Sequence, residues 1–403
     1  MNIGFVFIHA PGESMGSLYR VRSLCQGLTE ESHKCYIFTP FEYNEDWGPL
    51  VEFIQIPTFK SKGKLLTLIY KSIRKILNSK IFSRFTILNP RIFNLTIERI
   101  SNGLIEVVTK DTINLDVIIG ESEICGLILI HIKDELTIPI IVDYQNYWPI
   151  ELVEHKIIKE NSKKFNYLVD LEKEIINSAD FIITISKALE DFLVEQFGNN
   201  AKIKAVYNGG LAILDKPKKK EYPPKIINSG LVVHRSNFKL FLESLPYVLE
   251  KFPETQIFVT KKGEKLKYVM KLARKLNLNI NFYWKETIQE YLELLSECHV
   301  GVVTSTDELS RKLGFVAKIY DYFSVGVPVV ANDIGGWISI ITEERVGYLS
   351  TNDPKSLADK IIKLIENPEI SYEYGERGIK LLKEDLSVKS SALKLLKYIE
   401  TIF

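Results

Sequence analysis

The sequence predicts an α/β protein of two Rossmann-like domains, each a doubly wound parallel sheet covered by helices. Three observations lead to this prediction. The chain has 403 residues, too many for one ordinary hydrophobic core. Short β-branched runs alternate with longer segments of helical spacing, which is typical of a parallel sheet. The alternation stops at one Lys/Pro-rich stretch and then begins again.

In the first half of the chain, short apolar runs are joined by segments with apolar residues at helical spacing. The clearest helical segments are 17–31 and 168–179. The apolar runs are continuous, as expected for strands buried on both faces. The expected strands are 2–8, 35–40, 116–120, 138–144, 180–186 and 202–208.

The second half repeats this pattern, with expected strands at 225–230, 256–260, 300–305 and 327–333. We place the domain linker at DKPKKKEYPPK (215–225), which is polar and turn-prone. The predicted domains are 1–214 and 226–385, followed by an amphipathic helix within 386–403 that crosses back to the N-terminal domain. Ligands bind beyond the carboxyl ends of such strands, so we expect both domains to face one central cleft.

Composition restricts the class of protein. Hydrophobic residues make up 46% and charged residues 26%, as in a soluble enzyme. The longest uncharged apolar run, 124–132, is too short to cross a bilayer, and the first residues have no leader-like pattern. The cysteines are far apart, which argues against a zinc site or a disulfide framework: Cys25, Cys35, Cys125 and Cys298. We therefore expect a cytoplasmic protein without a metal.

Two strand-to-helix loops are candidates for binding an anion. The first expected strand runs into HAPGESMGSLYR, where Gly12 and Gly16 open a helix whose free N–H groups favour an anion. An ordinary strand-to-helix turn explains the same pattern. In the second half, Arg235 and Lys239 follow strand 225–230, where a diphosphate needs cations. Lys239 is also consistent with an ordinary surface lysine.

The stretch LGFVAKIYDYFSVGVPVV (313–330) raises a different question. We expect a helix over 316–324, ended by Gly326 in the left-handed conformation, with Pro328 opening the next strand. If the helix extends back to Gly314, that residue and Asp321 share one face, with Lys318 one turn before the aspartate. The rest of the helix is mostly apolar, so Asp321 is more than a solvated surface residue.

At these residues the chain resembles the retaining glycosyltransferases of family 4, which have the two-domain GT-B fold. The most specific match is DYFSVGVPVVANDIGGW, followed by RVGYLSTNDPKSLADKIIKLIENP. EYLELLSECHVGVVTST resembles the family's helix-then-strand block, and SHKCYIFT, SADFIITISKAL and KIKAVYNGG extend the match to the N-terminal half. The resemblance implies hexosyl transfer from a nucleotide-diphosphate sugar to an acceptor held by the N-terminal domain. It also implies retention of configuration, with no metal and no cofactor.

The resemblance also implies roles for single residues. The second acid of the family's Glu-x7-Glu motif falls on Asp321, which would bind the ribose hydroxyls. The first falls on Leu313, so contact with the donor sugar must differ here. The remaining residues implied to bind the nucleotide sugar, through backbone or side chain, are Gly16, Gly314, Phe315, Val316 and Lys318.

Two further motifs of the family are altered. Its basic pair for the diphosphate falls on Leu231 and Ser236, so we expect Arg235, helped by Lys312, to supply the cations. Its cleft strand ends here in QNYWP. We predict Gln145 and Asn146, together with Arg235, as catalytic residues, and Tyr147 and Trp148 as acceptor contacts. An amide is no general base, which fits a leaving diphosphate that takes the acceptor's proton.

The segment from Phe53 to Ile97 has nine basic residues and no acidic one. Apolar residues recur in it at helical spacing, which suits the surface of an anionic membrane. The expected membrane contacts are Lys64, Lys71, Arg74 and Lys75. A core helix with a solvated basic face is the alternative, while no motif supports binding of nucleic acid.

We therefore predict a cytoplasmic glycosyltransferase, peripheral on the inner face of the membrane, that extends a glycan or a lipid-linked glycan. Two alternatives remain open. One is a nucleotide-sugar epimerase of the same fold, which would need titratable groups around the sugar. The other is a non-catalytic module that binds a nucleotide sugar, since Leu313 replaces an expected glutamate.

Overall fold

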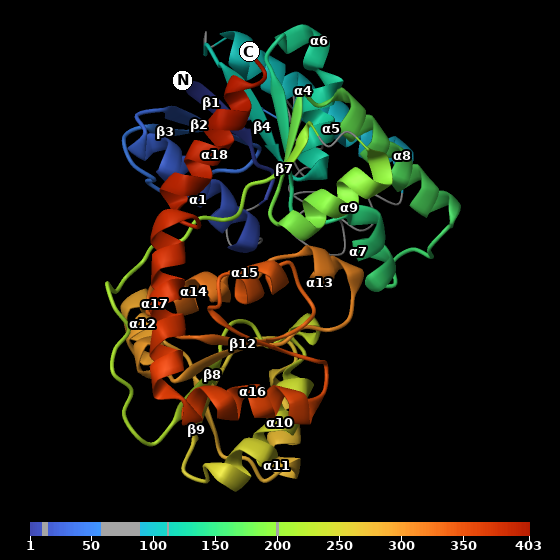
Figure 1. Ribbon diagram of the computed structural model, residues 1–403. Coiled ribbons are helices and arrows are strands. Elements are labelled where there is room, and N and C mark those ends of the chain that lie inside the picture. The colour runs from blue at the N-terminus through green and yellow to red at the C-terminus, as the bar shows by residue number, and fades with distance from the viewer. Residues whose placement is uncertain (10–14, 58–88, 111–112, 199–200) are drawn as a thin grey trace. The chain divides into compact units, whose positions relative to one another are not determined.

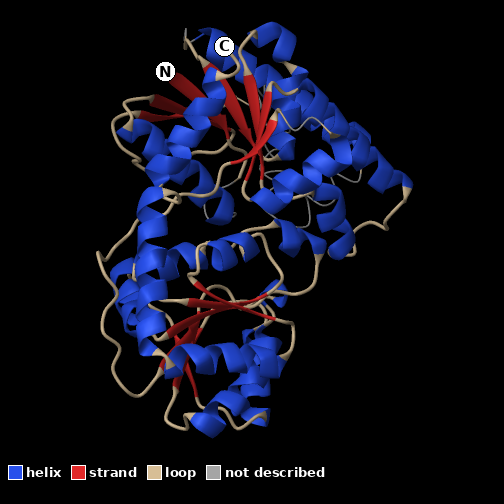
Figure 2. Cartoon of the chain, in the orientation of Figure 1, coloured by secondary structure: helices blue, strands red, loops and turns tan. Residues whose placement is uncertain are grey.

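The computed structural model describes residues 1–9, 15–57, 89–110, 113–198 and 201–403. They form two compact units, one made of Met1–Tyr207 with Ser391–Phe403 and the other of Asn208–Ser390. Each unit holds one parallel sheet with helices packed on its faces (Figures 1 and 2). The predicted class of fold, two Rossmann-like parallel sheets, is confirmed.

The sheet of the first unit has seven parallel strands in the order β3-β2-β1-β4-β5-β6-β7. The strand order reverses between β1 and β4, which pair directly, with Val6 opposite Gly120. Such a reversal is where ligands bind in doubly wound sheets. The strands are β1 (Asn2–Val6), β2 (Lys34–Thr39), β3 (Val51–Gln55), β4 (Val117–Glu121), β5 (Ile140–Tyr144), β6 (Phe181–Thr184) and β7 (Ile203–Ala205).

Helices pack on both faces of this sheet. Leu24 and Leu28 of α1 (Met15–Glu30) and Leu395 of α18 (Val388–Glu400) belong to the core over one face. On the other face, Gly126 of α5 (Glu123–His131) lies so close to Val142 that a Cβ atom would be 2.8 Å from it. The other helices of this unit are α4 (Pro90–Lys110), α6 (Lys133–Leu136), α7 (Trp148–Glu154), α8 (Lys163–Ser178) and α9 (Lys187–Phe197).

The sheet of the second unit has six parallel strands in the order β10-β9-β8-β11-β12-β13. Here the order reverses between β8 and β11, with Gly301 opposite Ile227. The strands are β8 (Lys225–Asn228), β9 (Gln256–Thr260), β10 (Ile280–Tyr283), β11 (Val300–Val303), β12 (Val329–Asn332) and β13 (Gly347–Ser350).

The helices of this unit surround its sheet. Leu245 of α10 and Ile361 of α16 belong to the core over one face, while Tyr322 of α14 covers Gly301 of β11. The helical elements are η1 (His234–Ser236), α10 (Phe238–Lys251), α11 (Leu266–Lys275), α12 (Ile288–Glu297), α13 (Leu309–Leu313), α14 (Lys318–Ser324), α15 (Ile338–Glu343), α16 (Pro354–Glu366) and α17 (Pro368–Glu384).

The boundary between the units falls at Tyr207, whereas the sequence placed a linker at 215–225. The residues before that linker already bind to the second unit. Gly210 forms a β-bridge with Ser387, and the N–H groups of Ile213 and Leu214 donate to the carbonyl of Ser324. These backbone bonds make 208–214 part of the second unit.

The helix expected over 316–324 is shorter and does not extend back to Gly314. Gly314 ends α13, and α14 begins only at Lys318, so Gly314 and Asp321 do not share a helix face. The carbonyl of Gly314 instead accepts a hydrogen bond from the N–H of Gly336. The expected end of the helix is confirmed, because Gly326 has φ +66° and β12 follows at Val329.

Candidate active site

The side chain of Asp321 lies on α14 and is held by a tyrosine of α12. Tyr291 Oη donates a hydrogen bond to Asp321 Oδ2 at 3.0 Å. Burial raises the pKa of Asp321 to about 6, although the Tyr291 bond and the charge of Lys318 lower it. The Tyr291 bond to Oδ2 also sets the orientation of the second carboxylate oxygen, Oδ1. This carboxylate can accept hydrogen bonds from hydroxyl groups of a ligand.

Lys318, one turn earlier on α14, points to the end of β8. Its Nζ donates to Asn228 Oδ1 at 2.9 Å and lies 5.9 Å from the centre of the Phe238 ring. Burial lowers the pKa of Lys318 to about 7, and the positive charge of Arg311 is the second cause of this shift. Gly230 has φ +88° and leaves room for this side chain, since a Cβ atom there would be 3.3 Å from Lys318 Cε. An anion would stabilise the ammonium form.

The ends of three neighbouring strands are joined by a polar network. Asn228, the last residue of β8, donates to Thr304 Oγ1 at 3.2 Å. Asn332, the last residue of β12, accepts from the N–H of Ser305 at 2.9 Å and donates to its carbonyl. Arg311 Nε in turn donates to Ser305 Oγ at 3.1 Å. Lys318 is thus hydrogen-bonded to a polar network at the carboxyl ends of β8, β11 and β12.

The other residues expected to bind the donor lie in the second unit, except for Gly16, which lies in the first. Lys312 is exposed and pairs with Asp307 at 2.7 Å. Arg235 is half-buried in η1, and its carbonyl accepts from the N–H of Thr306. Phe315 packs on Tyr320 with ring centres 5.1 Å apart, next to the half-buried Val316.

In the first unit, Gln145 follows β5 and joins two elements. Its Nε2 donates to Glu121 Oε1 at 2.5 Å, and its Oε1 accepts from Ser17 Oγ of α1 at 3.4 Å. Asn146 beside it is half-buried, and Gly16 near the start of α1 is exposed with open space around its Cα. Gln145 thus links the start of α1 to the end of β4.

A carboxylate–imidazole pair at this edge was not predicted from the sequence. His9 Nε2 lies 3.3 Å from Glu121 Oε2, and Glu121 is buried. Glu121 ends β4 and His9 follows β1, the two strands at the reversal of the order. Ligands bind beyond the carboxyl ends of such strands. A search for every polar residue at those ends would have found His9 and Glu121.

Other polar and aromatic side chains near this edge are buried within the first unit. Arg20 is fully buried and donates two hydrogen bonds of 2.9 Å to the two oxygens of Asp143. Tyr147 and Trp148 are also buried, and Trp148 packs on Phe93 with ring centres 5.9 Å apart. Their role as acceptor contacts stays a prediction.

Two family models together match most of the chain. The model described as Glycosyltransferase Family 4 matches residues 16–209, and the model described as Glycosyl transferases group 1 matches residues 212–381. The chain belongs to the group 1, family 4 glycosyltransferases. The resemblance seen in the sequence is thereby confirmed.

Curated relatives of this glycosyltransferase are distant. An uncharacterized glycosyltransferase of Methanocaldococcus jannaschii, MJ1069, is 26% identical over 261 residues, which is 61% of this chain and 65% of the relative. The chitobiosyldiphosphodolichol beta-mannosyltransferase of Kluyveromyces lactis is 23% identical over 261 residues, 55% of this chain and 56% of the relative. The chain thus matches less than two thirds of the length of either relative.

Solved structures support the fold of this glycosyltransferase over its whole length. Sucrose-phosphate synthase from Thermosynechococcus elongatus matches with a TM-score of 0.71 at 16% identity, covering 100% of this chain and 99% of that one. Anabaena HepE in complex with UDP matches with a TM-score of 0.70 at 14% identity, covering 100% of both chains. At these identities the likeness shows the GT-B fold.

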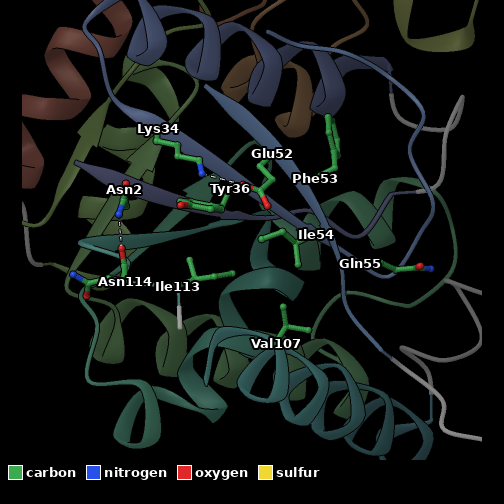
Figure 3. Close-up of a pocket in the computed structure, with 10 residues that line it drawn as sticks. All are labelled: Asn2, Lys34, Tyr36, Glu52, Phe53, Ile54, Gln55, Val107, Ile113 and Asn114. Carbon is green, nitrogen blue, oxygen red and sulfur yellow. Dashed lines mark hydrogen bonds and ion pairs between the residues drawn. The ribbon is translucent and has the colours of Figure 1, made fainter. Parts of the chain in front are cut away.

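One cavity of this glycosyltransferase lies away from the strand ends described above. It has a volume of about 690 Å³ and is lined by Asn2 and Lys34 at the amino ends of β1 and β2, by β3 and by Val107 of α4 (Figure 3). Lys34 pairs with Glu52 in it at 3.0 Å. Ligands of such sheets bind at the opposite edge, so we assign this cavity no part in catalysis.

Within the described ranges, no helix of this glycosyltransferase is long and apolar enough to cross a membrane. Those ranges also contain no group of three or more His, Cys, Asp or Glu residues placed to hold a metal ion. The expected membrane contacts, Lys64, Lys71, Arg74 and Lys75, lie outside the described residues.

Proposed function

We propose that this glycosyltransferase moves a hexosyl group from a nucleotide-diphosphate sugar to a glycan or lipid-linked glycan. The observation that carries the proposal is one polar edge of the second unit. There Lys318 meets Asn228 at the end of β8, while Tyr291 holds the carboxylate of Asp321 one helical turn away. A cation and an oriented carboxylate match the two polar parts of a nucleoside diphosphate.

In this proposal Asp321 binds the ribose and Lys318 the diphosphate. A carboxylate can accept both vicinal hydroxyl groups of a ribose, and an ammonium group can donate to phosphate oxygens. UDP is bound in the HepE structure, which supports UDP as the first nucleotide to test. Lys318 with Arg235 would neutralise the leaving diphosphate, so the reaction would need neither a metal nor a cofactor.

The relatives support a lipid-linked acceptor. The name of the Kluyveromyces lactis relative describes a mannosyl transfer involving chitobiosyldiphosphodolichol, and a relative from Mycobacterium leprae is a phosphatidyl-myo-inositol mannosyltransferase. We propose that this chain likewise acts on a sugar carried by a lipid. The acceptor would then be presented at a cytoplasmic membrane surface.

The basic residues 60–91 are proposed to attach the protein to that surface. Each Lys or Arg near an anionic membrane contributes ~1 kcal/mol, so half of the nine would give useful affinity. Flotation with vesicles containing anionic lipid tests this, comparing the wild type with the triple variant Lys71→Glu, Arg74→Glu, Lys75→Glu. Equal flotation of both proteins would reject the attachment.

We propose that the configuration at the anomeric carbon is retained. The family resemblance supports retention, in which the leaving diphosphate takes the acceptor's proton, since Gln145 and Asn146 are amides.

A nucleotide screen tests the proposed function. Thermal shift with UDP, GDP, ADP and CMP should reveal one that raises the apparent stability, since a ligand that binds only the native state does so. The matching nucleotide sugar should then release its nucleoside diphosphate only when an acceptor is present. Release without any acceptor, or conversion of the donor into an epimer, would contradict transfer. Binding without turnover would support a non-catalytic module instead.

A further inference from the structure

One face of α11 carries four cations and a tyrosine, all of them exposed. The opposite face is apolar, with Val269 and Ala273 buried in the core of the second unit, where α11 packs beside α10 (Figure 1). The exposed residues are three or four positions apart along the helix, a spacing that places them on one side. We call this face the α11 surface, and its members are Lys267, Tyr268, Lys271, Arg274 and Lys275.

The charge of the α11 surface is not neutralised within the described parts of the chain. α11 contains no acidic residue, and no ion pair joins its four cations to a described carboxylate. Other helices of the same unit differ, since Lys380 of α17 lies 3.9 Å from Glu384 and Lys239 of α10 lies 3.7 Å from Glu243. Like charges at this spacing repel one another, so a partner of opposite charge would be attracted to the α11 surface.

The loops on either side of α11 add to the positive charge and to the exposed aromatic area. Residues 261–285 include eight cations and one carboxylate, although the net charge of the whole chain is only +1. Lys262 Nζ lies 4.4 Å from the centre of the Trp284 ring. Trp284 is 52% exposed and Tyr268 is 49% exposed. Exposed Trp and Tyr side chains among cations are typical of the boundary between membrane and water.

The kind of cation indicates a broad negative surface rather than one small anion. Seven of the eight cations in residues 261–285 are lysines. A lysine is a flexible, hydrated point charge, whereas the planar fork of arginine suits recognition of a single phosphate. The four cations of the α11 surface also lie along the outside of a helix, which a flat partner can contact but which cannot enclose a small ligand. The surface of an anionic bilayer has the required charge and shape.

We propose that the α11 surface docks the second unit on an anionic membrane. The four cations would lie among the lipid phosphates, while Tyr268 and Trp284 would enter the headgroup region. This inference goes beyond the proposed attachment through residues 60–91, because α11 belongs to the other unit. It concerns the second unit by itself, and the binding that it predicts needs neither a donor nor an acceptor.

Flotation of the full chain with phosphatidylcholine vesicles, with or without phosphatidylglycerol, tests the proposal. The α11 variant carries Lys267→Gln, Lys271→Gln and Arg274→Gln. The matched control on α17 carries Arg377→Gln, Lys380→Gln and Lys383→Gln. Both variants lose two lysines and one arginine, but the three cations of the control are paired with carboxylates. Their total charge is therefore the same, and only the place of the lost charges differs.

The α11 variant should bind phosphatidylglycerol vesicles about 10- to 100-fold more weakly than the control, because each cation near an anionic surface contributes about fivefold. Binding of the wild type should fall as salt is added, since ions screen these charges. The difference should persist when both variants also carry Lys71→Glu, Arg74→Glu and Lys75→Glu, which remove the proposed attachment through residues 60–91. Equal binding of the α11 variant and the control in both backgrounds overturns the inference.

A second measurement locates the contact. The added tryptophan of Tyr268→Trp should be quenched by lipids brominated near the headgroup, whereas that of Tyr372→Trp, at an exposed position of α17, should not. The inference fails if neither tryptophan is quenched, or if both are quenched alike. It also fails if the α11 variant loses binding to single-stranded RNA but keeps its binding to vesicles, because the surface would then serve nucleic acid.

These outcomes are separate from the proposed function. Every variant should keep the thermal shift with the nucleoside diphosphate, which shows that the second unit is folded. Vesicle binding is measured without sugar transfer, so its absence would leave the proposed function intact. Vesicle binding by a protein that transfers no sugar would support the α11 surface and contradict the proposed function.

Discussion

The Nζ atom of Lys318 lies 2.9 Å from Asn228 Oδ1, so α14 carries a cation to the carboxyl end of β8. The family's basic pair would come from the loop after that strand, where this chain has Leu231 and Ser236. The cation therefore reaches the same strand end from another element. Burial lowers the pKa of Lys318 to about 7. A bound diphosphate would favour the charged form of this side chain, because opposite charges attract.

Replacing Lys318 by Met should weaken binding of the nucleoside diphosphate by about 10- to 100-fold, since hydrogen bonds to charged groups contribute ~1.5–3 kcal/mol. The measurement is isothermal titration with the nucleotide found in the thermal-shift screen. Lys380→Met is the control, because Lys380 is an exposed lysine of α17 that lies 3.9 Å from Glu384 on the same helix. An affinity of Lys318→Met equal to that of the Lys380→Met control would contradict a diphosphate contact by Lys318.

Replacing Asp321 by Asn should remove the preference for ribose. We expect the wild type to bind the ribonucleoside diphosphate about 10- to 100-fold more tightly than its 2′-deoxy form, because the hydroxyl donates to a charged oxygen. The variant should bind the two forms nearly equally. A preference that survives in Asp321→Asn would show that another group reads the ribose.

Tyr291→Phe tests whether the orientation of Asp321 matters. This substitution removes the 3.0 Å bond to Oδ2 and keeps the aromatic ring in place. We expect a smaller loss of ribose preference, about 3- to 10-fold, because the carboxylate that accepts the ribose hydroxyls remains and loses only the bond that orients it. In the double variant with Asp321→Asn the tyrosine should have no further effect, and an additive loss would mean that it acts elsewhere.

The affinity for the nucleotide should depend on pH with two limbs. Asp321 must be ionised to accept hydroxyl protons, and its pKa of about 6 predicts weaker binding as pH falls below 6. Lys318 must be protonated to bind phosphate, and its pKa of about 7 predicts weaker binding as pH rises above 7. Titration calorimetry from pH 5 to 9 should therefore show the tightest binding between about pH 6 and 7.

Each limb has its own variant as a check. Asp321→Asn should flatten the acid limb and leave the alkaline one, and Lys318→Met should do the reverse. The phosphate of the nucleotide also titrates in this range, so the comparison with the wild type, rather than the profile alone, carries the result. A wild-type profile reproduced by both variants would assign both limbs to the nucleotide.

The interior strands could be predicted from the sequence because they are buried on both faces and read as continuous apolar runs. β3 (VEFIQ), β10 (INFY) and β13 (GYLS) were not predicted. All three lie at the edges of their sheets and are partly exposed, so their apolar runs are interrupted. Each of these strands pairs with a single neighbouring strand, and the local sequence pattern carries no information about that neighbour.

The site was predicted unevenly for a similar reason. Asp321 could be singled out because its neighbours on the helix are apolar. The bond between Lys318 and Asn228 joins residues 90 positions apart, and no spacing rule relates them. The pairing of β1 with β4 brings His9 to Glu121 from 112 positions away (121 minus 9). Only the fold brings such pairs together.

The last helix offers a prediction about stability. Leu395 of α18 is fully buried in the core of the first unit, together with Leu24 and Leu28 of α1, while Leu393 two positions earlier is 44% exposed. Leu395→Ala should lower the free energy of unfolding by ~2–5 kcal/mol, since a buried leucine leaves a cavity. Leu393→Ala, the matched control on the same helix, should change it by less than ~0.5 kcal/mol.

Because Leu395 belongs to the first unit and the proposed donor site to the second, the loss of stability should affect the first unit only. Chemical denaturation of Leu395→Ala in the presence of the nucleotide should show an early transition that the nucleotide does not shift. The later transition should rise with nucleotide concentration as in the wild type. A single transition that the nucleotide stabilises completely would mean that the two units unfold as one.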